Sequence, residues 1–323
     1  MLALIALLAL LLLVLAPWRA SSAAPVATPT AGVSGADDPT PEELDEAGDQ
    51  LTAGKAVILG VVEGVTEFLP ISSTGHLLVT QRILDIGTTS GTKDVADTYA
   101  IAIQFGAILA IVFLYFGRIR TMVEGLAGRS ESGRRILVGL VVAFLPAVVI
   151  GVIFEPLIKE RLLGTWQVIA AWAVWGVVTL FVSDRWGREG GGPIESITVR
   201  QGLLIGVAQV LAMWPGTSRS LVTILAALVL GLSLAAAVEF SFLLGLVTLG
   251  GATVYETLTN GSTMFDAYGW LDPLLGLIAA FIAAMIAVKW MVGYLQRHSF
   301  AIFGWYRIVV AAVATVLVVT GTI

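Results

Sequence analysis

Two glutamates, three hydroxyl side chains and a histidine interrupt a strongly apolar stretch of the chain, VVEGVTEFLPISSTGH at residues 61–76. Glu63 and Glu67 lie four residues apart, so on a helix their carboxylates share one face. Ionisable residues inside apolar segments are costly and usually functional. The pair could hold a hard divalent cation, or one member could act as a general base. In the competing interpretation, the two acids pair with other polar groups or line a structural water cavity.

The residues that follow the acids add a helix break and nucleophilic groups. Pro70 should end a first helix, and Ser72, Ser73 and Thr74 should open a second one. Free N–H groups at a helix N-terminus favour anions such as phosphate, although a Ser/Thr cluster can also simply cap the helix. His76 can shuttle protons near neutral pH and activate a hydroxyl, whereas a lone histidine on an apolar face is more often structural.

A second break, WPGTSRSLVT at residues 214–223, carries the complementary charge. The planar guanidinium of Arg219 suits phosphate oxygens. Alternatively, Arg219 pairs with Glu63, Glu67 or Glu239 and holds two parts of the chain together. Four further residues of this motif are expected to contact the same ligand: Gly216, Ser218, Ser220 and Thr223.

The composition indicates which elements carry these groups. Of the 323 residues, 57% are hydrophobic and 13% are charged, with a mean hydropathy of +0.93, against about 25% charged residues in a soluble protein. A polytopic membrane protein is predicted, and its spans must be helices because backbone groups in the bilayer have to be paired internally. A β-barrel would need short alternating strands, whereas these apolar runs are continuous. Six runs are long enough to span: residues 99–116, 136–153, 166–183, 235–257, 272–292 and 301–323.

The remaining composition excludes several classes of function. The chain has no cysteine, which excludes disulfides, thiol catalysis and Cys-ligated metals. Its net charge of −5 is dispersed and implies no nucleic-acid partner. Residues 1–24 are predicted to be a signal-like or anchor segment, and residues 25–50, rich in Pro, Ala, Thr and acids, a flexible acidic linker. Residues 51–323 are left for the membrane domain.

The distribution of basic residues predicts the orientation of the spans. Lys and Arg are abundant in loops 117–135, 184–200 and 289–298, which should therefore be cytoplasmic. With this orientation, the apolar stretch 201–232 begins and ends inside. The stretch 53–84 would begin and end outside if the N-terminus is external, as a cleaved signal would leave it. Both stretches contain Pro and Gly near their middle. Both are therefore predicted to be re-entrant helix–loop–helix hairpins, which are tolerated only where protein or a water-filled cavity surrounds them.

The two hairpin sequences also resemble each other. Aligning ILGVVEGVTEFLPISS with LIGVAQVLAMWPGTSR pairs Gly60 with Gly206, Glu63 with Gln209, Phe68 with Trp214 and Ser72 with Ser218. Each half, about 51–185 and 200–323, would contain one re-entrant hairpin and three transmembrane helices, and the odd number of spans inverts the second half. Inverted repeats with broken helices place a polar site at the repeat interface, where Gln209 should be a lining group.

The two motifs, EGVTEFLPISSTGH at 63–76 and PGTSRSLVT at 215–223, resemble those of the bacitracin-resistance family of undecaprenyl-diphosphate phosphatases. The resemblance covers about residues 51–323, and one departure is Leu221, where members often have Gly. It implies hydrolysis of undecaprenyl diphosphate to undecaprenyl phosphate and phosphate, which recycles the cell-wall carrier lipid and confers bacitracin resistance. It also implies a divalent cation, Mg²⁺ or Ca²⁺, and an active site on the external side of the bacterial inner membrane, and it leaves a homodimer open. The catalytic set that it marks is Glu63, Glu67, Ser72, Ser73, His76 and Arg219.

These residues predict a mechanism and leave one competing class. Ser73 should attack the terminal phosphorus or orient the water that does, with His76 or Glu67 taking the proton. Arg219 and the metal, held by Glu63 and Glu67, should stabilise the charge of the transition state. The alternative is a transporter or flippase of the polyprenyl phosphate lipid, because inverted repeats with broken helices are also a transporter plan. The hydroxyl–His–Arg set favours the enzyme, since anion binding alone needs no nucleophile and base.

Overall fold

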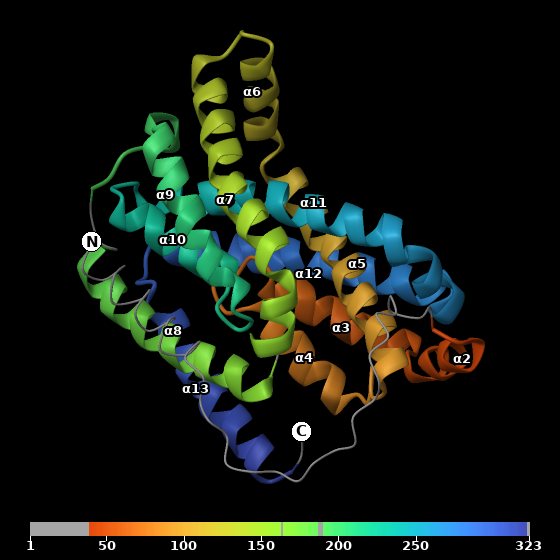
Figure 1. Cartoon of the computed structure of the whole chain (residues 1–323). Coiled ribbons are helices and arrows are strands. Elements are labelled where there is room, and N and C mark those ends of the chain that lie inside the picture. Colours follow the sequence, from red (N-terminus) through yellow and green to blue (C-terminus); the bar gives the residue numbers. More distant parts are fainter. Residues whose placement is uncertain (1–38, 163, 187–189, 322–323) are drawn as a thin grey trace. The chain divides into compact units, whose positions relative to one another are not determined.

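The computed structural model describes residues 39–162, 164–186 and 190–321 of the chain (Figure 1). Within these ranges the structure is helical, and its only β-type pairing is an isolated bridge between Gly192 and Leu232. The predicted all-α class is therefore confirmed for the described part of the chain. The predicted signal-like segment 1–24 and most of the predicted linker lie outside the described residues.

Six helices of the described chain are long and apolar enough to cross a membrane. Each overlaps one of the six predicted apolar runs, so hydropathy located every span, although several helices extend into more polar sequence than the runs do. The six are α5 (Ser90–Leu114), α7 (Glu131–Leu162), α8 (Thr165–Trp186), α11 (Leu234–Tyr268), α12 (Leu271–Leu295) and α13 (Ala301–Val319).

Helix α2 (Pro41–Gln50) corrects the predicted linker, which extended to residue 50. Thr40 and Glu43 form a capping box at its start, with Pro41 in the first turn. Hydrogen bonds from the Thr40 amide and hydroxyl lower the pKa of Glu43. The helix packs against α5 and α11 and buries Ala47 completely. The acids of α2 lie on its exposed face, and their number led the sequence analysis to predict a flexible linker where the structure has a helix.

Four shorter helices form two pairs, each interrupted by a short segment without regular helix. The first pair is α3 (Ala53–Thr66) and α4 (Ser73–Ile83), and residues 67–72 between them are the first break. The second pair is α9 (Val199–Gln209) and α10 (Arg219–Val229); a 3₁₀ turn, η2 (Val210–Met213), leads into the second break, residues 214–218. Another 3₁₀ turn, η1 (Ile194–Ser196), precedes α9.

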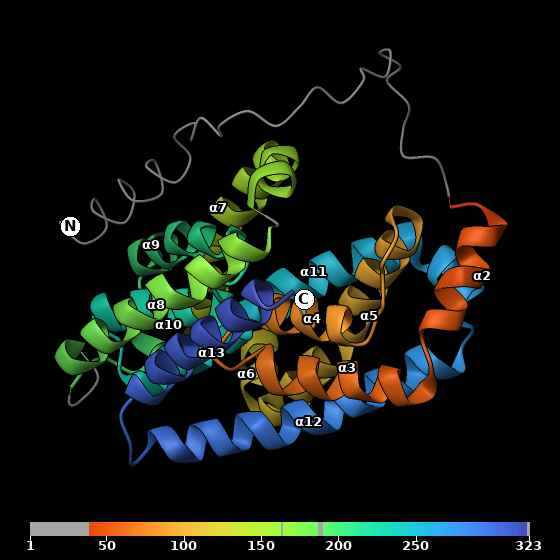
Figure 2. The same ribbon diagram turned by 90° about the horizontal axis from the view of Figure 1, so that it is seen from below.

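The short helices pack closely on spans from the opposite half of the sequence. Helix α3 lies along α12, and α9 lies against α7 (Figures 1 and 2). A side chain at Gly60 would place its Cβ 2.1 Å from the Gly276 carbonyl oxygen, and one at Gly206 would place its Cβ 2.3 Å from that of Ala143. Glycine is required at both positions because the backbones are in contact. Helices α8 and α13 pack together, as do α5 and α11, and α6 (Phe116–Leu126) packs against α7.

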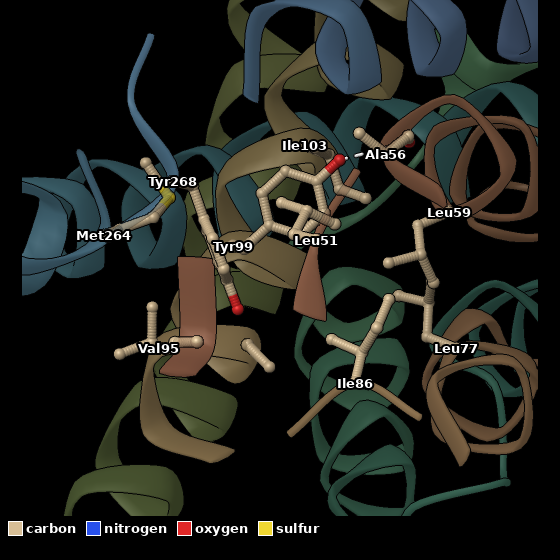
Figure 3. Packing of buried hydrophobic residues seen from close by; sticks show 12 residues of the cluster. Leu51, Ala56, Leu59, Leu77, Ile86, Val95, Tyr99, Ile103, Met264 and Tyr268 are labelled. Atoms are coloured by element: carbon tan, nitrogen blue, oxygen red, sulfur yellow. Dashed lines mark hydrogen bonds between the residues drawn. The ribbon is translucent and has the colours of Figure 1, made fainter. Parts of the chain in front are cut away.

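A buried cluster at the α2 end of the molecule fixes α3 relative to α5. Tyr99 on α5 is fully buried and donates a hydrogen bond from its hydroxyl to the Ala56 carbonyl over 3.1 Å (Figure 3). Its ring meets the ring of Tyr268 edge-on, with centroids 5.6 Å apart. Leu59 and Leu77 extend the cluster to α3 and α4. The helix that carries Glu63 is thus held on a packed apolar base.

Candidate active site at two helix breaks

The site centres on Glu67, whose two carboxylate oxygens bind groups from distant parts of the sequence. The Ser73 hydroxyl donates a hydrogen bond to Oε2 of Glu67, and Nη2 of Arg219 donates one to Oε1 over 3.1 Å. Glu67 begins the first break, Ser73 begins α4 and Arg219 begins α10. One carboxylate therefore joins the two predicted motifs.

Arg219 is held by groups beyond its ion pair with Glu67. Nη1 donates to the Ser241 carbonyl over 2.9 Å, and the guanidinium carbon lies 5.2 Å from the centre of the Phe68 ring. A Cβ at Gly245 would lie 2.3 Å from Nη1, so α11 approaches the guanidinium closely at this position. Nε of Arg219 is buried without a hydrogen-bond partner in the described part of the chain. The arginine is thus fixed in place while its Nε–H stays without a partner among the described residues.

Glu63 lies one helical turn before Glu67 and is 1% exposed. Neither of its carboxylate oxygens has a hydrogen-bond partner among the described residues. Glu67, Gln104 and Arg219 are its polar neighbours, and Gln104 accepts a hydrogen bond from Thr253 over 3.1 Å. A buried carboxylate without partners is costly, so this position suits a bound cation or a proton.

The acid pair fits the predicted divalent cation. Within the described ranges, no cluster of three or more His, Cys, Asp or Glu side chains could enclose a metal by itself. Mg²⁺ is commonly held by one or two carboxylates, with water and substrate phosphate oxygens completing its shell. Glu63, with two unpartnered oxygens, and Glu67 beside it supply that donor set.

His76 contacts the first break but not the serine hydroxyl. Its Nδ1 lies 2.6 Å from the Ser72 carbonyl oxygen, and its Nε2 lies 2.9 Å from the hydroxyl of Tyr306 on α13. The ring also packs against Trp172, with centroids 5.1 Å apart. Among the described residues, no hydrogen bond joins His76 to Ser73. The geometry therefore favours Glu67 over His76 as the group that takes the serine proton.

Both breaks end in a serine with a left-handed backbone. Ser72 has φ 76° and ψ 101°, and Ser218 has φ 77° and ψ 112°. Non-glycine residues adopt such angles at a cost of about 1–3 kcal/mol, usually at functional sites. The Ser218 hydroxyl accepts a hydrogen bond from the Leu221 amide and caps α10, whereas no side chain caps α4. The α4 N-terminus, with Thr74 exposed beside it, is therefore the freer of the two for an anion.

Two other predicted ligand residues of the second motif, Ser220 and Thr223, form hydrogen bonds with backbone carbonyls of the protein itself. Ser220 and Thr223 are fully buried. The Ser220 hydroxyl donates to the Leu69 carbonyl over 3.0 Å, which ties α10 to the first break, and the Thr223 hydroxyl donates to the Arg219 carbonyl over 2.9 Å. Gln209 is 3% exposed, and neither polar atom of its side chain has a partner within the described chain.

Glu239 is not a partner of Arg219, although the sequence left that pairing open. It forms an ion pair with Arg118, whose Nη1 also donates to Glu195 over 2.6 Å. This group joins α11, α6 and η1. It is a structural contact between helices and is separate from the two breaks.

An apolar groove of about 720 Å³ opens beside the first break. Leu69 and Ile71 of the break form one part of its wall, and Tyr306, the partner of His76, forms another. Apolar side chains of α3, α12 and α13 complete the lining, Val61, Val65, Ile282, Ile286, Trp290 and Phe303 among them. The groove thus borders the segment that lies between Glu67 and Ser73.

Comparison with known proteins shows the family. A model of the family described as bacitracin resistance protein BacA matches residues 56–313, which include both breaks. The chain belongs to the BacA family. It is a multi-pass membrane protein of that family, with the six apolar helices described above.

Several similar proteins carry the name undecaprenyl-diphosphatase. The undecaprenyl-diphosphatase of Sorangium cellulosum (strain So ce56) is 42% identical over 262 residues, 80% of this chain and 83% of the relative. That of Bradyrhizobium sp. (strain BTAi1 / ATCC BAA-1182) is 42% identical over 271 residues, 83% of this chain and 97% of the relative. Undecaprenyl-diphosphatase 1 of Acinetobacter baylyi (strain ATCC 33305 / BD413 / ADP1) is 34% identical over 273 residues, 84% of this chain and 98% of the relative.

Three side chains around the site of this BacA family member were not selected from the sequence. Trp172 is 1% exposed and donates from its indole N–H to the Ile71 carbonyl over 3.1 Å, which ties α8 to the first break. Tyr306 binds His76. Arg307 is fully buried. Its charge within an apolar run was the available signal, by the same criterion that selected the acids.

Proposed function

We propose that this chain is an integral membrane phosphatase that hydrolyses undecaprenyl diphosphate to undecaprenyl phosphate and inorganic phosphate. This activity recycles the cell-wall carrier lipid and confers resistance to bacitracin. The relatives named undecaprenyl-diphosphatase support the proposal. The observation that carries it is the buried arrangement in which Glu67 binds both the Ser73 hydroxyl and Arg219.

Ser73 is the proposed nucleophile and Glu67 its base. As Oγ of Ser73 bonds to the terminal phosphorus, its proton passes to Oε2 of Glu67. The bond from that phosphorus to the bridging oxygen breaks, and undecaprenyl phosphate leaves with the electron pair. Water then attacks the phosphorus of the phosphoserine, the bond from phosphorus to Oγ breaks, and Oγ takes the proton back from Glu67 as phosphate leaves. Arg219 stabilises the negative charge that gathers on the phosphoryl oxygens.

Glu63 and Glu67 are the residues that would hold Mg²⁺ or Ca²⁺. When bound, such a cation supplies positive charge against the diphosphate oxygens. The uncapped N-terminus of α4 offers backbone N–H groups to the same anion. His76 holds the Ser72 carbonyl and so orients the first break, which positions the neighbouring Ser73 for the reaction.

The apolar groove receives the first part of the polyprenyl chain. Its walls continue from the first break, so a lipid whose diphosphate lies at Ser73 has an apolar path away from the site. A substrate held in the bilayer by its tail explains why a phosphatase site is built inside membrane helices.

The fold is proposed to be an inverted repeat of two re-entrant hairpins, each followed by three spans. The nearly equal φ angles of Ser72 and Ser218 support this, as does the reciprocal packing of α3 on α12 and α9 on α7. The basic loops are cytoplasmic in this arrangement, and the site faces the external side of the inner membrane.

Phosphate release from undecaprenyl diphosphate by the purified protein in detergent tests the function. We expect release that requires Mg²⁺ or Ca²⁺ and that disappears in Ser73→Ala. A flippase of the monophosphate lipid would release no phosphate under these conditions, because detergent leaves no membrane to cross. A well-folded wild type that releases none contradicts the phosphatase.

A further inference from the structure

Arg307 is a fully buried cation that the mechanism above leaves unused. Its guanidinium donates to three backbone carbonyls: Pro70 over 3.3 Å, Ala171 over 3.3 Å and Gly216 over 2.6 Å. Within the described ranges, no carboxylate forms an ion pair with it. A buried charge without a counter-charge is unfavourable. We therefore looked for a function of the guanidinium in the groups to which it donates.

The carbonyls that Arg307 binds identify that role. Pro70 lies in the first break and Gly216 in the second, and the two occupy equivalent positions when the breaks are aligned on Ser72 and Ser218. The third carbonyl, of Ala171, belongs to α8. One side chain therefore joins the same point of both breaks to a neighbouring span.

The backbone at Gly216 leaves little room for an alternative position. It has φ 91°, and a Cβ there would lie 2.7 Å from the Val168 carbonyl oxygen on α8. The guanidinium fixes this turn from one side while α8 closes it from the other. Three residues later the chain reaches Arg219, the partner of Glu67.

We propose that Arg307 is a positioning residue that sets the distance between the two breaks, so that Ser73 and Arg219 reach Glu67 together. The proposal rests on the phosphatase function proposed above. A guanidinium presents several donors in a rigid fork and can bind three carbonyls at once, whereas a lysine ammonium at the same place is a point charge on a flexible stem. A misplacement of about 1 Å in such a site lowers turnover by roughly 10²-fold.

Turnover of Arg307→Lys and Arg307→Gln tests the proposal, with Arg118→Lys as the matched control. Arg118 is partly buried and forms ion pairs with Glu239 and Glu195, neither of which belongs to a break. We expect kcat to fall roughly 10²-fold in both Arg307 variants, with KM for the lipid changed less than about 3-fold because the apolar groove is intact. Arg118→Lys should lower the thermal midpoint and leave kcat of the folded fraction unchanged. Folded Arg307 variants with wild-type kcat would overturn the proposal.

A distance measurement tests the same role without activity. The chain has no cysteine, so spin labels can be attached at Thr74→Cys beside the first break and Ala212→Cys beside the second. We expect a single narrow distance distribution with Arg307 and a broader or displaced one with Arg307→Gln. Identical distributions would refute the positioning role. An inactive wild type would refute the phosphatase instead, and the distances would still decide the role of Arg307.

Discussion

Ser72 and Ser218 close the two helix breaks with almost the same φ, 76° and 77°, yet the side chains around them differ in charge and in what they bind. The first break lies between a buried acid pair and a helix without a side-chain cap. The second presents Arg219 on a helix that Ser218 caps. A similar backbone turn thus occurs twice, once beside the proposed nucleophile and base and once beside the arginine that is proposed to stabilise the transition state.

The largest effect is expected from removing the reactive groups of the first break. Ser73→Ala and Glu67→Gln should each lower kcat by roughly 10³-fold or more, because nucleophile and base act as one unit. Thr259→Ala, which removes an exposed hydroxyl bound only within α11, is the control and should retain full activity. Phosphate release from the purified proteins gives the comparison, and an active Ser73→Ala would assign the attack to a water.

The second break should be somewhat more tolerant. Arg219→Lys keeps the charge but loses the fork that binds the Glu67 carboxylate and the Ser241 carbonyl together. We expect a loss of roughly 10²-fold in kcat, of the size found when one donor of an oxyanion-type site is removed. If Arg219→Lys were as inactive as Ser73→Ala, the difference between the breaks would disappear.

Glu63 and Gln209 occupy matching positions in the two halves, and both have unpartnered polar atoms in the described structure. We expect Glu63→Gln to raise the Mg²⁺ or Ca²⁺ concentration for half-maximal activity at least about tenfold, in line with the loss of a ligand-shell group. Gln209→Leu should leave this concentration unchanged. A titration of activity with metal for the two variants checks this, and equal shifts would mean that neither position is specific for a cation.

The smallest effect concerns the strained serines. Ser72→Gly relieves a left-handed backbone and removes no helix cap, so it should raise the free energy of unfolding by about 1 kcal/mol. Ser218→Gly relieves similar strain but loses the hydrogen bond from the Leu221 amide, so its stability should stay within a few tenths of a kcal/mol of wild type. Thermal unfolding of the two variants measures the difference, and equal shifts would show that the Ser218 cap contributes nothing.

The sequence predicted the parts of this protein that depend on local pattern. Hydropathy located all six spans, and the acids, hydroxyls and Arg219 stood out because each is polar within an apolar run. Helix α2 was missed because average composition outweighed the capping signal at Thr40 and Glu43. The capping signal lies within four consecutive residues, so the sequence alone was sufficient to predict this helix.

Contacts between distant residues could not be predicted in this way. Tyr306, the partner of His76, lies 230 residues away from it in the sequence. Arg118, the partner of Glu239, lies 121 residues away. Nothing in the spacing of either residue specifies its partner. The packing of α13 therefore showed what the sequence could not, that the two ring nitrogens of His76 lie beside the Ser72 carbonyl and the Tyr306 hydroxyl.

The central claim is that the two breaks form a single site through Glu67, and a double-mutant cycle tests it most directly. Turnover would be measured for Glu67→Gln, Arg219→Gln and the double variant, all with confirmed folding. Because Arg219 binds the carboxylate of Glu67, we predict that the double variant is about as slow as the slower single one, within about 3-fold. Losses that multiply would show that the two residues act independently, and would contradict the account.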